Sequence, residues 1–223
     1  PNLSKYIQSG NKKKIDFIQN KALELSLFLS LPATIALLIA SDEITSSLFG
    51  YGSFDEISVK NSANALFYFA LGLPAFSFIK IFSSFLFARH NTKIPFYFSV
   101  ISVIINIIIS VYYFDKIGFI IIPVATTISS WFYAVILLIY LSKKKYYLIN
   151  LKFIKSLLKI TLSTVFTSSI FYSLINYFSE NLTYNSDYKL LTIILLVIVT
   201  FIIYILISIL TKAFKISDIK LKY

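Results

Sequence analysis

Long uninterrupted runs of apolar residues dominate this chain, and short lysine-rich segments separate them. Stretches without any Asp, Glu, Lys or Arg cover residues 25–41, 61–79, 94–114, 117–142, 160–179 and 190–211. A helix of about 20 apolar residues crosses the hydrocarbon core of a bilayer. The runs lack the alternation typical of strands, and lipid offers no partners for open backbone groups, so helices are expected. The pattern predicts an all-α, polytopic membrane bundle with six transmembrane helices.

The composition supports a membrane protein and excludes several other classes. Hydrophobic residues make up 57% of the 223 residues and charged residues only 14%, with a mean hydropathy of +0.80. A soluble domain of ordinary composition carries roughly 25% charged residues. The absence of cysteine excludes disulfides and thiolate metal sites. Because methionine is also absent and residue 1 is proline, we expect a segment of a longer protein.

Motifs for catalysis or cofactor binding are missing from the sequence. It contains no nucleotide-binding loop, no pair of catalytic carboxylates and no metal-ligand spacing. The single histidine, His90, has no nearby nucleophile with an orienting carboxylate. We therefore expect no catalytic residues, no metal, no cofactor and no enzymatic activity.

Lysine placement predicts how the six helices are oriented. Cations dominate the N-terminal segment, the connections after the second and fourth spans, and the C-terminal tail, whereas most carboxylates lie in the other connections. By the positive-inside rule, both termini are cytoplasmic. The net charge of +11 is explained by these loops, so nucleic acid is not expected as a partner. The cations assigned to the cytoplasmic side are Lys5, Lys12, Lys13, Lys14, Lys21, Arg89, Lys93, Lys143, Lys144, Lys145, Lys152, Lys155, Lys159, Lys212, Lys215, Lys220 and Lys222.

The first 21 residues are predicted to be distinct from the spans. Ile15, Ile18, Ala22 and Leu25 recur at helical spacing with lysines on the other faces, which is typical of a short amphipathic helix along the inner membrane surface. A solvated loop is an equal alternative for residues 1–12. The resulting division is an interfacial segment at 1–21, four spans at 22–145, and a cytoplasmic loop, two spans and a tail at 146–223.

Three prolines lie inside predicted spans. Pro32, Pro74 and Pro123 each remove a backbone hydrogen bond, and membrane helices tolerate the resulting kink when neighbours satisfy the freed carbonyl. They are candidate hinges of a bundle that bends or encloses a cavity. The alternative is ordinary transmembrane proline, which is common and needs no special role.

Lys80 is the one ionisable residue well inside a predicted span. Charges at that depth usually face a cavity or the bundle interior. Its apolar run continues to Ala88, about 12 Å further along the helix, so the lysine stem could also snorkel toward the surface. With Arg89 near the same end, Lys80 is a candidate for binding an anionic group such as phosphate.

Three blocks of sequence carry a resemblance to a known family. Residues 1–33 begin with Pro-Asn-Leu-Ser-Lys and end with Leu-Pro-Ala, and residues 48–54 read Leu-Phe-Gly-Tyr-Gly-Ser-Phe. Residues 71–95 contain Leu-Gly-Leu-Pro-Ala-Phe, then Lys80, then Phe-Ala-Arg-His-Asn-Thr-Lys-Ile-Pro. Together these blocks resemble the MurJ/MviN lipid II flippases of the multidrug/oligosaccharidyl-lipid/polysaccharide exporter superfamily. The resemblance covers residues 1–145, and beyond 150 it rests on hydropathy and helix number.

The resemblance implies a part of a larger two-lobed transporter. Family members have fourteen helices, and this chain is similar to helices nine to fourteen, so the missing N-terminal lobe is expected on the same polypeptide. The implied activity is alternating-access translocation of a lipid-linked disaccharide-pentapeptide, of undecaprenyl diphosphate type, across the bacterial inner membrane. Membrane lipids are the other expected partners. The last two helices would line a groove for the polyprenyl tail, with Phe166, Ile170, Ile198 and Ile202 as candidates.

Other functions stay open at this point. A polysaccharide-unit flippase or drug exporter of the same superfamily would share the helices and their orientation. An integral-membrane transferase would need a base near the membrane surface, for which His90 is the candidate. A scaffold subunit would show no coupling between a lipid substrate and conformation.

Overall fold

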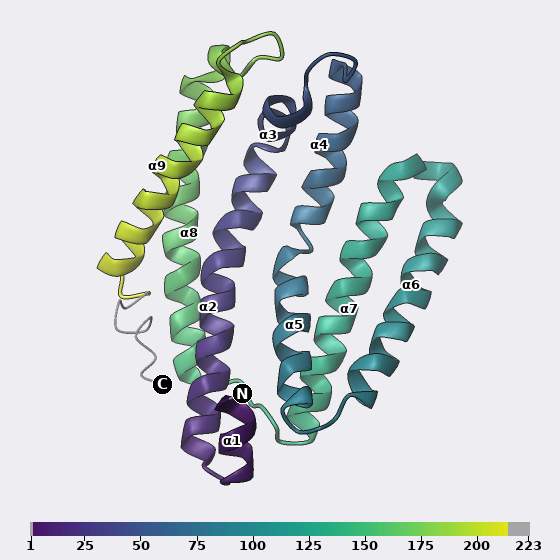
Figure 1. Ribbon diagram of the computed structural model, residues 1–223, viewed down its shortest axis with the longest axis vertical. Helices are drawn as coiled ribbons and strands as arrows, with labels where there is room; N and C mark the ends of the chain where they lie inside the picture. The colour runs from purple at the N-terminus through teal and green to yellow at the C-terminus, as the bar shows by residue number, and fades with distance from the viewer. Residues whose placement is uncertain (1, 214–223) are drawn as a thin grey trace. The chain divides into compact units, whose positions relative to one another are not determined.

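The computed structural model describes residues 2–213, and every regular element in that range is a helix (Figure 1). The predicted all-α membrane bundle is therefore confirmed. The longer helices are α2 (Lys12–Ile39), α4 (Glu56–Ala70), α5 (Leu73–Phe87), α6 (Lys93–Ile117), α7 (Ile121–Lys143), α8 (Leu151–Tyr177) and α9 (Lys189–Leu210). The shorter ones are α1 (Asn2–Gln8), α3 (Ser41–Phe49) and the 3-10 turns η1 (Gly118–Ile120) and η2 (Ser179–Leu182).

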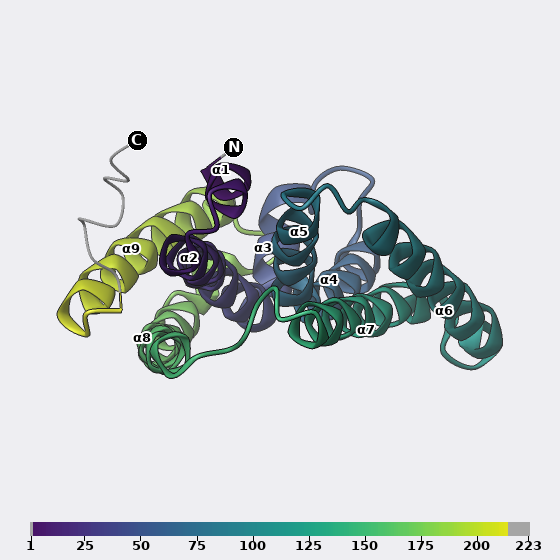
Figure 2. The same ribbon diagram turned by 90° about the horizontal axis from the view of Figure 1, so that it is seen from below.

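The number of membrane crossings follows from these lengths. Four continuous helical stretches of the described residues are long and apolar enough to cross: Lys12–Ile39, Lys93–Lys143, Leu151–Tyr177 and Lys189–Leu210. Helices α4 and α5 meet at a 42° bend and together make a fifth. The 51-residue stretch Lys93–Lys143 turns back at Gly118, so α6 and α7 lie side by side as a hairpin (Figure 2). Dividing this hairpin at its turn gives the six crossings expected from hydropathy.

Contacts divide the chain into two compact units. The first comprises Pro1–Ser30 and Leu71–Ile154, and the second comprises Leu31–Ala70 and Lys155–Tyr223. The boundaries lie inside α2 and at the break between α4 and α5, so neither unit is a continuous piece of sequence.

In the first unit, α7 packs against both α5 and α6. The α6–α7 pair is joined through polar groups: the Ser102 hydroxyl donates to the Ser129 carbonyl at 2.8 Å, and the Asn106 amide donates to the Thr126 hydroxyl at 3.0 Å. Small polar residues serve close helix packing in membranes. Gly118 has a φ of 71°, a conformation that side chains disfavour, and this permits the reversal after α6. Most of the outer face of α6 is apolar and exposed, as expected for a lipid-facing helix.

In the second unit, α3 packs against α4 and α9, and α9 contacts η2. Its apolar core contains Ala40, Phe171, Ile175, Leu182, Ile193 and Leu196. A 2.9 Å hydrogen bond between the hydroxyls of Ser163, midway along α8, and Thr211, directly after α9, joins these two helices. The core thus draws on both sequence segments of this unit.

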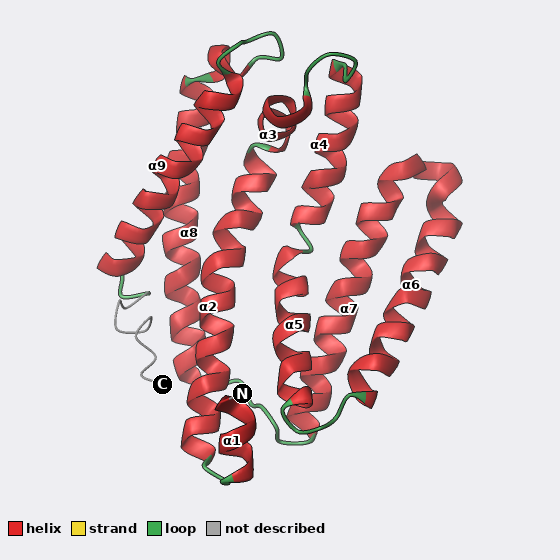
Figure 3. Ribbon diagram, in the orientation of Figure 1, coloured by secondary structure: helices red, strands yellow, loops and turns green. Residues whose placement is uncertain are grey.

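The N-terminal segment differs from the sequence expectation (Figure 3). An interfacial segment over residues 1–21, distinct from the first span, was expected, but α2 runs from Lys12 to Ile39 without a break at residue 21. The reason is that no glycine interrupts this stretch and its apolar face is buried, with Leu23 and Leu27 only 1% and 2% exposed. The turn that separates α1 from α2 instead lies at Gly10, whose φ is 66°.

Two further differences concern helix ends. Helix α8 begins at Leu151, in a segment predicted as a loop up to residue 159, because its lysines are exposed and lysine is a good helix former. Helix α3 was not predicted, since its polar residues separate it from the apolar run before it. The predicted tail cations Lys215, Lys220 and Lys222 lie outside the described residues.

The three candidate hinge prolines occupy different positions. Pro74 is the second residue of α5, directly after the 42° bend. Pro32 lies inside α2, which continues through it. Pro123 is in the first turn of α7, where a helix leaves its N–H groups without partners in any case, so proline there removes no helical hydrogen bond.

Candidate functional site

The two candidate cations, Lys80 and Arg89, belong to the first unit and lie along or just after α5. Lys80 is exposed on the helix itself, and Arg89 is half-buried in the turn that follows it. Nine positions separate them, about 13 Å of helix rise. Within residues 2–213 no contact joins their side chains, so the structure does not bring the two charges into one binding contact.

Arg89 holds the end of α5 against the segment after α7. One guanidinium nitrogen, Nη1, donates to the Phe85 carbonyl at 2.7 Å, and Nη2 donates to the Tyr146 carbonyl at 3.0 Å. The guanidinium also lies 4.6 Å from the centre of the Tyr146 ring. A cation that satisfies a terminal helix carbonyl is favoured by the helix dipole as well. Arg89 therefore stabilises the fold here, whatever else its remaining N–H groups bind.

Two neighbouring tyrosines complete this junction. The Tyr146 carbonyl also accepts a hydrogen bond from the Gln19 amide at 3.1 Å, and the Tyr147 hydroxyl donates to Asn20 Oδ1 at 3.0 Å. Tyr147 is buried against the rings of Phe82 and Phe85. Burial, and next the negative charges of Glu24 and Asp16, raise the pKa of Tyr147. The segment after α7 is thus fixed to α2 and to α5.

Sequence reasoning missed this junction, because it placed Tyr146 and Tyr147 in a cytoplasmic loop. The available signal was two adjacent aromatic residues between a lysine run and an apolar segment, which is unusual for a solvated loop.

The turn from α5 to α6 is shaped by Asn91 and His90. The Asn91 side-chain oxygen accepts a 3.3 Å hydrogen bond from the Ile94 N–H and so satisfies one of the free donors that begin α6. His90, the candidate base of a transferase, is exposed and has a φ of 57°. Asn91 thus caps the start of α6 through its side-chain oxygen, as short polar side chains commonly do at helix N-termini.

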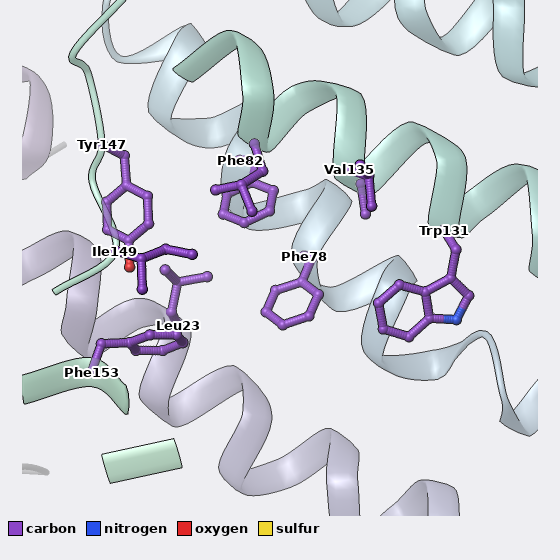
Figure 4. A pocket seen from close by; sticks show the side chains of 10 residues that line it. Leu23, Phe78, Phe82, Trp131, Val135, Tyr147, Ile149 and Phe153 are labelled. Atoms are coloured by element: carbon purple, nitrogen blue, oxygen red, sulfur yellow. The ribbon is translucent and has the colours of Figure 1, made fainter. Parts of the chain in front are cut away.

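A wholly apolar hollow lies beside this junction in the first unit (Figure 4). Its volume is about 110 Å³. The side chains of Phe78, Phe82 and Trp131 point into it, as do lining side chains from other segments, such as Leu23 and Ile149. It exposes no polar lining surface. The lining residues are Leu23, Phe78, Phe82, Trp131, Ala134, Val135, Leu138, Tyr147, Ile149 and Phe153.

Each unit also has a larger hollow, of about 590 Å³ in the first unit and about 320 Å³ in the second. Both have walls of polar and apolar residues. The one in the first unit contains Lys93 and Tyr133, whose hydroxyl donates to the Pro95 carbonyl at 2.8 Å. The one in the second unit contains the carboxylates of Asp42, Glu43 and Glu56. Within the described residues, no three His, Cys, Asp or Glu side chains are placed to hold a metal ion.

Lys189, the first residue of α9, is buried in the second unit. It is 2% exposed, and its Nζ donates to the carbonyls of Gly50 and Tyr184, both at 2.6 Å. The same ammonium lies 4.2 Å from the ring centre of Tyr51 and 4.6 Å from that of Tyr184. No carboxylate of the described range forms an ion pair with it. We call these four residues the Lys189 clasp.

Neighbouring hydrogen bonds extend the clasp. The Ser47 hydroxyl donates to the Lys189 carbonyl at 3.2 Å, and the Tyr184 hydroxyl donates to the Phe54 carbonyl at 2.9 Å. Together they tie the α3–α4 connection to the connection before α9. Sequence reasoning did not single out Lys189, because nothing in the pattern distinguishes a buried lysine next to an apolar run from an exposed one.

The candidate tail-groove residues lie on α8 and α9 of the second unit. Phe166, Ile198 and Ile202 are 61%, 49% and 52% exposed, whereas Ile170 is half-buried. All four are therefore available to hydrocarbon, either a substrate tail or bulk lipid.

Comparison with known proteins decides which family these features belong to. The family model described as lipid II flippase MurJ matches residues 1–193. The chain belongs to the MurJ lipid II flippase family. It is similar to the probable lipid II flippases MurJ of Rickettsia prowazekii, 36% identical over 144 residues, and of Thermotoga maritima, 37% identical over 116 residues.

These matches cover more than half of this chain but less than half of each similar protein. The Rickettsia match covers 65% of this chain but 28% of the relative, and the Thermotoga match covers 51% and 24%. A solved structure, lipid II flippase MurJ in an inward closed conformation, has a TM-score of 0.74 and 25% identity over 94% of this chain and 41% of that one. The chain thus spans well under half the length of the family members it matches. Its membrane helices and family make it a multi-pass membrane protein.

Proposed function

We propose that this chain is the C-terminal part of a flippase that translocates lipid-linked peptidoglycan precursor, lipid II, across the bacterial inner membrane by alternating access. It would supply helices nine to fourteen of a two-lobed transporter, with both ends of the segment in the cytoplasm. Its partners would be the lipid-linked disaccharide-pentapeptide, membrane lipids and an N-terminal lobe of the same polypeptide.

The observation that carries this proposal is the fold match to a MurJ structure over 94% of the chain, together with a family match over residues 1–193. The six helical crossings support it, since the lobes of such transporters are built from helices around a central site. The lysine distribution supports cytoplasmic ends through the positive-inside rule.

Lys80 is the better candidate for contact with the substrate diphosphate. Its ammonium is exposed on a membrane helix, a costly position that is usually functional. Arg89 already donates to two carbonyls, so its first effect would be on the junction with Tyr146. The 42° bend at Pro74, one turn and a half before Lys80, would let α5 move relative to α4 during transport. Pro32 and Pro123 are weaker hinge candidates.

The polyprenyl tail would lie along α8 and α9. The exposed side chains of Phe166, Ile198 and Ile202, with Ile170 beside them, offer the apolar surface that such a tail needs. A tail in this position would remain in hydrocarbon while its head group crosses the bilayer.

Complementation of a conditional lipid II flippase mutant tests the proposal. We expect the full-length gene to restore growth. At equal protein level, Lys80→Ala should abolish rescue, because a phosphate would lose its charge partner, whereas Lys80→Arg should retain it. Lys93→Ala is the matched control, since Lys93 is also exposed and lies outside the apolar part of a span.

The outcomes separate function from site. No rescue by the wild-type protein at a normal membrane level would overturn the flippase assignment and favour another exporter of the superfamily. Full rescue by Lys80→Ala would overturn only the contact with the diphosphate. Loss of protein in Arg89→Ala, rather than loss of activity at equal level, is expected if Arg89 acts through the Tyr146 junction.

A further inference from the structure

The apolar hollow of the first unit offers no polar surface to a ligand. Its two amphipathic lining residues direct their polar atoms elsewhere: the Trp131 indole N–H donates to the Leu71 carbonyl at 3.0 Å, and the Tyr147 hydroxyl donates to Asn20. A water molecule inside would have no hydrogen-bond partners, and apolar cavities of about 150 Å³ stay dry and bind small hydrocarbons. The roughly 110 Å³ hollow therefore suits a segment of an alkyl chain.

The segment that forms one wall of the hollow is strongly cationic. Tyr147, Ile149 and Phe153 line it, and the exposed lysines 143–145 and Lys152 flank them in sequence. No carboxylate occurs between residues 143 and 159. The acids whose charges act on Tyr147, Glu24 and Asp16, are on α2, where Glu24 pairs with Lys21 at 3.5 Å. Clusters of lysine next to a membrane helix attract anionic lipids.

We propose that this hollow is a binding site for one acyl chain of an anionic glycerophospholipid, whose phosphate is held by lysines 143–145 and Lys152. The chain lies against Phe78, Phe82 and Trp131, and the head group stays at the lysine-rich end. Because the wall segment also carries the Tyr146 and Tyr147 contacts, a bound lipid stabilises the junction of α2, α5 and α7. This inference does not depend on the flippase assignment.

Photolabelling of the full-length protein tests the site. The protein is reconstituted in nanodiscs with phosphatidylglycerol or phosphatidylcholine that carries a diazirine on one acyl chain, and labelled peptides are mapped by mass spectrometry. We expect labelling within 131–138 and 147–153, several-fold stronger with phosphatidylglycerol. Replacing the four lysines by glutamine should reduce the phosphatidylglycerol signal to the phosphatidylcholine level.

Two variants that fill the hollow are compared with a matched control. Val135→Trp and Leu138→Phe both place extra volume at lining positions, and we expect each to reduce labelling several-fold. Ile139→Trp is the matched control. Ile139 lies on the same helix and is 48% exposed, against 49% for Val135, but it does not line the hollow. Labelling of this variant should therefore be unchanged.

Three results would overturn the inference. Equal labelling of Val135→Trp, Leu138→Phe and Ile139→Trp would show that the hollow is not the chain site. Equal labelling by the two lipids would remove the role of the lysines. Displacement of the probe by a low molar ratio of polyprenyl diphosphate would assign the hollow to a prenyl chain instead. None of these results bears on growth rescue, so the two proposals fail separately.

Discussion

At the scale of single residues, Lys189 shows how a buried charge is stabilised without an opposite charge. Two carbonyl oxygens and two aromatic faces surround its ammonium, and charge-assisted hydrogen bonds and cation–π contacts strengthen in a water-poor site. We expect Lys189→Met to lower the free energy of unfolding by about 1–3 kcal/mol, because the Gly50 and Tyr184 carbonyls lose their buried donor. Thermal unfolding of the full-length protein measures the change. Lys60→Met, at an exposed lysine of α4, should leave stability unchanged, and an equal loss in both variants would contradict the clasp.

Glu43 gives a prediction about pH at the same scale. Burial raises the pKa of Glu43 above its ordinary value of 4.5; a backbone hydrogen bond opposes this rise, and repulsion from Asp42 makes a smaller addition to it. A carboxyl whose pKa is higher in the folded state holds its proton longer there, so its contribution to stability is lost as pH rises through 4.5 and above. Glu43→Gln should therefore raise the melting temperature at pH 7 and leave it unchanged at pH 4. The exposed Glu56 is the control, and an equal effect of Glu43→Gln at both pH values would refute the assignment.

At the scale of elements, α2 decides whether the N-terminal segment is a separate surface helix or part of a span. Because α2 is continuous from Lys12 to Ile39, proline at position 22 would break it. We expect Ala22→Pro to cost about 3 kcal/mol of unfolding free energy. Lys13→Pro should cost little, since it lies in the first turn, where N–H groups have no helical partner. Chemical denaturation of the full-length protein distinguishes them, and similar midpoints for the two variants would favour a hinge near residue 21.

The elements also show what the sequence could and could not predict. The apolar runs predicted all the membrane helices, because length and hydropathy alone decide whether a helix can cross a bilayer. The kink candidate Pro74 does lie at the bend between α4 and α5, but helix α3 and the early start of α8 were missed, since they depend on packing around residues such as Ala40. The candidate cations were named from sequence, but only the structure shows that Arg89 donates to the Tyr146 carbonyl. Lys189 was missed for the same reason: burial of one lysine is a property of the folded loops around it.

At the scale of the whole molecule, this chain corresponds to only part of the family members that it matches. Its matched region covers 28% of the Rickettsia relative and its fold covers 41% of the MurJ structure, so most of each family member lies outside the match. Alternating access needs two lobes that move around a shared site. We therefore expect residues 1–223 expressed alone to reach the membrane without restoring growth to a flippase-depleted strain.

Supplying the rest of the protein on a second plasmid should restore growth, because membrane helices associate after insertion through packing of small and polar residues. An immunoblot of the membrane fraction checks that both parts are present. Residues 1–223 carrying Lys80→Ala, expressed with the same second part at equal level, should fail to restore growth if Lys80 contacts the substrate, which would tie rescue to this chain and not to the other part alone. Growth with residues 1–223 as the sole source would contradict the two-lobe requirement, and it would assign transport to these six crossings.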